Sequence, residues 1–217
     1  MWTIWYARRQ LIHEGIHQSP YETHRFVLSF IADLDQLAPV KESQKSTNQP
    51  HARQSFRWIP PREECLKINV DAGVSEGTNV GTAVALCRDR DRNYLGSSML
   101  VFEGLTDPTT LEAIACREGM ALAQDLGVNH LQIASDCKHV INHIHQRAGG
   151  DHGSIVREIL QTSTLFTACN FLFEPRESNY EAHRLARFGI SLPAGRHLWL
   201  GIQHDPIVIP MNILVDQ

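Results

Sequence analysis

The clearest alternation of apolar and polar positions begins at Leu66. Apolar residues occupy every second position from there to Val70, which predicts a strand that ends at Asp71 and turns at Ala72-Gly73. Two further strands are predicted at 81–88 and 94–102, joined by a polar hairpin turn. Three consecutive strands with short connections predict an antiparallel meander.

The spacing of apolar residues becomes helical after this meander. A helix is predicted from Thr110 to Leu126, capped by Thr109 or Thr110 and ended by Gly127. A short strand follows at 131–135. The remaining predicted elements are helices at 138–147 and 154–165, a strand at 170–174 and a helix at 178–188. Since a strand joined through a helix to another strand favours parallel pairing, the pattern predicts an α/β domain with a mixed sheet.

Four segments of different composition divide the chain. Residues 1–37 have helical spacing in two pieces and predict a helical extension. Residues 38–57 are almost free of apolar side chains and predict a flexible linker. The predicted domain occupies 58–191. The apolar residues of the tail, 192–217, show no clear periodicity, which leaves open whether the tail packs on the domain.

Composition narrows the class of protein. The 217 residues are 42% hydrophobic and 20% charged, as in a soluble globular protein, and the N-terminus lacks the order of a signal peptide. We therefore expect an intracellular protein. The five cysteines are odd in number and contain no C-x-x-C pair, so neither a disulfide framework nor a zinc ribbon is predicted. A net charge of −4 argues against nucleic-acid binding through a broad basic surface, so such contacts would be local or bridged by cations.

Glu112 is the most informative residue of the predicted helix at 110–126. At about 100° per residue it falls in the same sector as the small and apolar side chains of Ala115, Cys116 and Gly119. A carboxylate on a buried face needs a positive partner such as a metal ion or an arginine. The alternative is a glutamate near the start of the helix that favours the helix dipole and points to the rim.

Asp71 and Asp136 each follow a predicted strand. If those strands are parallel neighbours, both side chains emerge at the same edge of the sheet, where open α/β folds bind ligands. Together with Glu112 they would form a carboxylate cluster that makes physical sense as a cage for a hard divalent cation such as magnesium. Taken singly, each aspartate is more often a turn former or a helix cap.

Five short segments carry a resemblance to a known family. They are Lys67-Ile68-Asn69-Val70-Asp71, Thr110-Leu111-Glu112-Ala113, Ala134-Ser135-Asp136, Glu174-Pro175-Arg176-Glu177-Ser178-Asn179 and Ala182-His183-Arg184-Leu185-Ala186. In this order and spacing they resemble the RNase H-like domain of plant proteins derived from non-LTR retroelements, from about Cys65 to Ser191. The N-terminal helical stretch also resembles the segment before this domain in retroelement polyproteins.

The resemblance implies a five-stranded mixed sheet flanked by helices, and a monomeric metal-dependent endonuclease that hydrolyses the RNA strand of RNA/DNA hybrids. It implies two magnesium ions, or manganese in their place, with Asp71 bridging both, Glu112 holding one and Asp136 completing the cage. Glu112 would also help to recognise the 2′-hydroxyl of RNA. Arg176 and Asn179 would contact substrate phosphate or orient the loop near the site, although Asn179 also fits a plain helix-entry turn.

Two departures from the family pattern bear on activity. His183 occupies the fourth acidic position of the catalytic site, and an extra residue, Ala72, separates Asp71 from Gly73. Because imidazole is a poor ligand for magnesium, one ion is expected to bind more weakly or to be manganese. The alternative function is a catalytically inactive nucleic-acid-binding module that keeps the fold.

Two histidine patterns offer competing metal sites. His13-Glu14-Gly15-Ile16-His17 matches the zinc motif H-E-x-x-H, but the internal glycine and the nearby Pro20 weaken the helix that the motif requires. His139 and His143 are spaced for one helix face, with Cys137 and His145 nearby, and are better explained as a solvated helix face.

Overall fold

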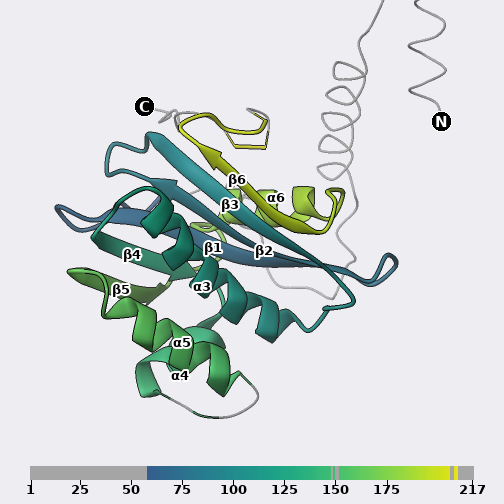
Figure 1. The fold of residues 1–217 in the computed structure, drawn as a ribbon. Coiled ribbons are helices and arrows are strands. Elements are labelled where there is room, and N and C mark those ends of the chain that lie inside the picture. The colour runs from purple at the N-terminus through teal and green to yellow at the C-terminus, as the bar shows by residue number, and fades with distance from the viewer. Residues whose placement is uncertain (1–57, 148, 150–151, 206–207, 210–217) are drawn as a thin grey trace, which may run out of the picture. The chain divides into compact units, whose positions relative to one another are not determined.

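The computed structural model describes residues 58–147, 149, 152–205 and 208–209. A six-stranded sheet runs in the order β5-β4-β1-β2-β3-β6 (Figure 1). The strands are β1 Leu66–Ser75, β2 Val80–Arg88, β3 Tyr94–Glu103, β4 His130–Ser135, β5 Ala168–Phe173 and β6 Gly195–Leu200. The N-terminal helical extension, the linker and the H-E-x-x-H pattern lie outside the described residues.

Both parts of the predicted sheet are confirmed. The first three strands pair antiparallel in chain order, while β4 is parallel to β1 and β5 is parallel to β4. The difference from the expected five strands is β6, which pairs antiparallel with β3 at the edge. Part of the tail thus belongs to the sheet, and Val208 and Ile209 beyond it are buried.

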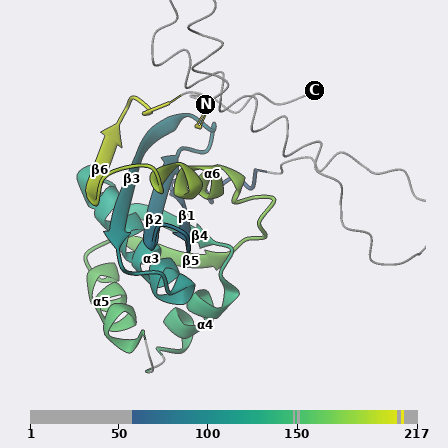
Figure 2. The ribbon, with the colours of Figure 1, turned by 90° about the vertical axis from the view of Figure 1, so that its right-hand side faces the viewer.

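Helices cover both faces of the sheet (Figure 2). They are α3 Pro108–Asp125, α4 Lys138–Gln146, α5 Gly153–Ser163 and α6 Tyr180–Gly189. On β2, Ala83 and Ala85 join one core cluster with residues of α3, α4 and α5, whereas Val84 and Leu86 join a second cluster with residues of α6. Because successive strand residues point to opposite faces, α6 lies on the opposite face of the sheet from α3, α4 and α5.

The start of α3 differs in detail from the prediction. The N-cap is Asp107, whose carboxylate accepts a hydrogen bond from the backbone N–H of Thr110 at 2.7 Å, and Pro108 is the first helical residue. Asp is a strong N-cap and Pro favours the first helical position, so the helix begins before Thr109. Among the described residues, the helices are too short or too polar to cross a membrane.

The polar side of α3 is also more buried than its spacing suggested. Helix periodicity places Glu118 on the side of α3 opposite Glu112, but Glu118 is 4% exposed. The reason is β6, from which the Arg196 guanidinium donates to Glu118 at 2.8 Å and to Asp125 at 2.5 Å. A long-range ion pair therefore covers a position that helix periodicity alone assigns to solvent.

Candidate metal site

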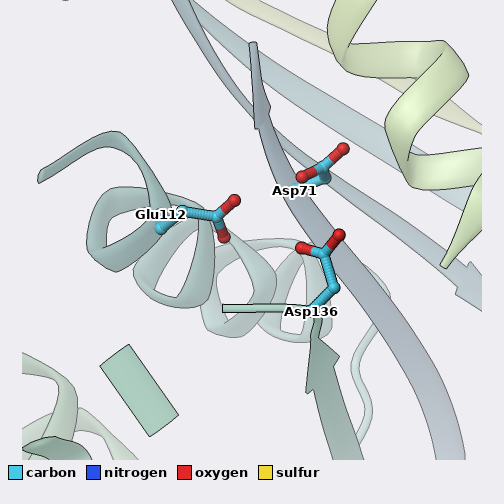
Figure 3. Close-up of side chains that lie close together, drawn as sticks. All are labelled: Asp71, Glu112 and Asp136. Atoms are coloured by element: carbon cyan, nitrogen blue, oxygen red, sulfur yellow. The ribbon is translucent and has the colours of Figure 1, made fainter. Parts of the chain in front are cut away.

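Three carboxylates from separate elements meet at one edge of the sheet. Asp71 lies on β1, Glu112 on α3 and Asp136 directly after β4, and one oxygen of each lies within 4.8 Å of the others. Figure 3 shows the three side chains pointing toward one another. The structure thus brings together the three carboxylates that the sequence analysis selected, and among the described residues they form the one such group of three metal-ligand side chains.

Parallel pairing of β1 with β4 sets the two aspartates at the same level. The last paired residues are Val70 and Ser135, and Asp71 and Asp136 directly follow them in the chain. The strand was predicted to end at Asp71, but β1 continues to pair with β2 as far as Ser75. Asp71 lies instead at the level where the neighbouring strand β4 ends, so β4 no longer pairs with β1 there.

Gly73, where a turn was predicted, lies within β1 at a close approach of α6. A Cβ on this residue would lie 2.6 Å from Thr82 Oγ1 and 2.9 Å from the carbonyl oxygen of Ala186. The missing side chain allows the backbone of α6 to approach β1 closely. The glycine therefore serves the packing of α6 beside the site.

The Glu112 side chain is buried and held by Ser135. The hydroxyl of Ser135 donates to Glu112 Oε2 at 3.1 Å and accepts the backbone N–H of Cys137 at 3.0 Å. Sequence patterns alone do not identify Ser135 as a site residue. Its place directly before Asp136 is the one signal that could have identified it.

The electrostatics of the cluster favour a bound cation. Burial raises the pKa of Glu112 well above its usual range, and the charges of Asp71 and Asp136 raise it further, while the Ser135 hydrogen bond opposes them. Burial and Asp71 also raise the pKa of Asp136, against the lowering effect of Arg176 and His183. Since the three side chains offer hard oxygen donors, the residues present fit a divalent cation such as Mg²⁺ or Mn²⁺.

His183 of α6 lies beside the cluster but contributes no carboxylate. Its Nδ1 is 2.9 Å from Asp71 Oδ2, and the Nη2 of Arg176 is 2.7 Å from its Nε2. Arg176, in the loop between β5 and α6, is exposed. The structure therefore places both predicted residues at the site, in contact with each other.

Asn179 is buried beside the site and hydrogen-bonded within the protein. It is 1% exposed, its Nδ2 donates to the carbonyl of Val70, and its Oδ1 accepts from Asn69 Nδ2, both at 2.9 Å. Its geometry supports the other expectation, that Asn179 orients the loop.

The histidine pair on α4 is a weaker metal candidate. The rings of His139 and His143 are 4.0 Å apart between centroids. Within the part of the chain that the structure describes, neither Cys137 nor His145 joins them in a group of three ligands. The solvated helix face stays the better interpretation.

Comparison with known proteins agrees with this fold. The sequence profile described as reverse transcriptase-like matches residues 69–189, and no curated protein matches. RNase H1 from Halobacterium salinarum is 15% identical with a TM-score of 0.50, covering 56% of this chain and 94% of its own. The RNase H domain of rv2228c from Mycobacterium tuberculosis is 21% identical with a TM-score of 0.52, covering 58% and 92%.

A third solved structure, of LC11-RNase H1 isolated from compost by a metagenomic approach, was determined in complex with an RNA/DNA hybrid. It is 16% identical with a TM-score of 0.52, and the match covers 58% of this chain and 96% of that one. At these identities the likeness shows the fold, and the plant retroelement origin stays a prediction. Because the matching profile spans more than half of the 217 residues, the chain belongs to the reverse transcriptase-like family and contains an RNase H-like domain.

Proposed function

We propose that this protein is a divalent-metal-dependent endonuclease that hydrolyses the RNA strand of RNA/DNA hybrids. The observation that carries the proposal is the convergence of Asp71, Glu112 and Asp136 within 4.8 Å. Like charges close together at a largely buried site destabilise the protein unless a cation neutralises them. The RNase H neighbours, one of them in complex with a hybrid, support this class of substrate.

The chain's own residues divide the work of such a site. The three carboxylates would hold the cation, and Ser135 fixes the orientation of Glu112 through its hydrogen bond. A divalent ion, when bound, supplies a water of lowered pKa and stabilises the leaving 3′ oxygen. Arg176 is the exposed cation beside the cluster, where it can contact a substrate phosphate. Glu112 would lie near the 2′-hydroxyl that distinguishes RNA from DNA.

The direct test is cleavage of a hybrid with a labelled RNA strand by the full chain, in Mg²⁺ or Mn²⁺. Asp71→Asn is expected to reduce the rate at least about 100-fold, since removal of even an outer-shell partner of a metal site costs 10–100-fold. Asp91→Asn is the matched control, because Asp91 is an exposed residue of the turn before β3. Duplex DNA of the same sequence tests whether the cut requires RNA.

One observation favours the alternative function, a binding module without catalysis. The fourth acidic position holds His183, which contacts Asp71 in place of a carboxylate. If the wild type and Asp71→Asn bind the hybrid equally and neither cleaves it in either metal, the nuclease proposal is wrong and the binding module remains.

A further inference from the structure

Phe173 is an aromatic residue at the surface beside the carboxylate cluster. It is the last residue of β5, it pairs with Ser135 of β4, and it is 46% exposed. The next residue, Glu174, donates its backbone N–H to the carbonyl of Ser135 at 3.0 Å. Since Asp136 directly follows Ser135, Phe173 lies one strand away from the carboxylates, at the same carboxyl end of the parallel strands (Figure 1).

Its position distinguishes Phe173 from the other exposed apolar residues. Single apolar side chains on a surface are ordinary and need no function. Among the described residues, the other large apolar side chains that are exposed are all aliphatic, and they lie before β1, after α5 or on and after β6. They are Ile59, Leu165, Leu198, Leu200 and Ile202.

A cation accompanies the ring of Phe173. The ammonium nitrogen of Lys138, the first residue of α4, lies 5.9 Å from the centroid of the ring. Lys138 is exposed and forms no ion pair among the described residues, so its charge is open to a phosphate. Arg176, three residues after Phe173, is a second exposed cation at this end of the strands.

An aromatic ring beside a cation is suited to the sugar-phosphate backbone of a nucleic acid. The ammonium pairs with a phosphate, and the ring offers an apolar face. In an A-form duplex the bases are stacked inside, and the wide, shallow minor groove presents the riboses with their 2′-hydroxyls. The ring therefore meets a ribose rather than the face of a base.

The spacing of the β-strands indicates which strand of a hybrid is contacted. Neighbouring β-strands lie about 4.8 Å apart. Nucleotides of one strand of a double helix advance by about 3.4 Å along the axis. If the scissile RNA phosphate lies at Asp71, Glu112 and Asp136, Phe173 falls within about three nucleotides of it on the same strand. The DNA strand lies across the wide minor groove.

We propose that Phe173 and Lys138 form a binding subsite for the RNA strand beside the cut, with the ring on a ribose and the ammonium on a phosphate. The inference rests on the proposed nuclease function, which supplies the position of the RNA strand. The subsite gives local contacts to a chain whose net charge is −4.

Anisotropy of a fluorescently labelled RNA/DNA hybrid measures binding to the full chain, in EDTA so that no metal-dependent cut occurs. Phe173→Ala is expected to raise Kd about 5- to 10-fold without changing its salt dependence, and Phe173→Trp to keep Kd near that of the wild type. Lys138→Gln should lower the slope of log Kd against log salt concentration by about one, because one phosphate contact is lost.

Leu165→Ala is the matched control, because Leu165 is 68% exposed but lies beyond the end of α5. Its Kd should equal that of the wild type. An unchanged Kd for Phe173→Ala, or an equal loss of affinity in Leu165→Ala, would overturn the subsite. Circular dichroism melting shows that each variant is folded before its Kd is compared.

Photochemical cross-linking locates the contact. Phe173→p-benzoylphenylalanine is expected to cross-link to the RNA strand within about three nucleotides of the cut, and cross-links on the DNA strand alone would overturn the inference. If the wild type cleaves the hybrid but Phe173→Ala binds and cleaves it equally well, the subsite fails and the nuclease proposal stands. If binding depends on Phe173 but the wild type cleaves in neither Mg²⁺ nor Mn²⁺, the nuclease proposal fails and the nucleic-acid subsite stands.

Discussion

Replacing Glu112 by glutamine is expected to stabilise the metal-free protein at neutral pH. At 4.8 Å and an effective dielectric constant of about 20, two unit charges repel by roughly 3.5 kcal/mol, and Glu112 faces two such neighbours, Asp71 and Asp136. Burial and these charges raise the pKa of Glu112, which favours the protonated, uncharged carboxyl and so lessens the repulsion. Glutamine is close to the protonated side chain in shape and removes the repulsion altogether.

The ordinary pKa of a glutamate carboxyl, 4.5, sets an upper limit on how much Glu112→Gln can stabilise the protein. Holding such a carboxyl protonated at pH 7 costs about 3 kcal/mol, at roughly 1.36 kcal/mol for each pH unit. We therefore expect Glu112→Gln to raise the free energy of unfolding by about 1–3 kcal/mol at pH 7 in EDTA. Above pH 4.5 the folded state binds more protons here than the unfolded state, so the wild type loses stability as the pH rises toward the folded pKa. The extra stability of the variant over the wild type is thus absent near pH 4 and increases as the pH rises.

Urea unfolding followed by circular dichroism, in EDTA at several pH values and then in Mg²⁺ or Mn²⁺, measures this effect. The metal is expected to stabilise the wild type and to have a much smaller effect on the variant. Glu118→Gln is the matched control on the same helix. Glu118 is buried like Glu112, but it pairs with Arg196 at 2.8 Å, so loss of its charge should destabilise the fold. If Glu112→Gln also destabilises the protein in EDTA at pH 7, Glu112 has a positive partner within the chain and the metal-cage argument fails.

Two further substitutions test how the fold positions the site. Gly73→Ala is expected to destabilise the protein by about 1–3 kcal/mol, because the new Cβ would overlap neighbouring atoms of β2 and α6. Gly77→Ala is the control: the space around Gly77 is open, so its melting temperature should change little. Glu181→Ala is expected to lower the free energy of unfolding in urea by about 3 kcal/mol, because it removes the bidentate partner of the fully buried Arg88. The control, Glu63→Ala, removes the partner of Arg90 in an exposed ion pair and should cost below about 1 kcal/mol. Equal losses in the two variants would contradict this reasoning.

Local periodicity was sufficient to predict the five strands shared with the RNase H fold and the burial of Glu112. The pattern around β1 illustrates its limit. It assigns Lys67 and Asn69 to the face opposite Ile68 and Val70, but it does not show that this face is also buried. Polar residues can be buried when each finds a partner, and the partners come from segments more than 100 residues later in the chain.

The missed strand β6 has a related cause. It pairs with one neighbour at the sheet edge, and Leu198 and Leu200 are partly exposed, so its apolar pattern is weak. Its main consequence, the ion pairs of Arg196 with α3, is likewise a contact between distant parts of the sequence. Contacts of this kind also place His183 against Asp71, which no local pattern predicts.

Three polar contacts along β1 hold the loop and helix that carry His183. Every second residue from Lys67 to Asp71 takes part: Lys67 pairs with Glu174 at 2.5 Å, Asn69 with Asn179 at 2.9 Å and Asp71 with His183 at 2.9 Å. A shift of register would leave several buried polar groups without partners, so the first two contacts fix the third. The fold of this segment therefore holds His183 at Asp71, and replacing His183 is expected to leave the other two contacts in place.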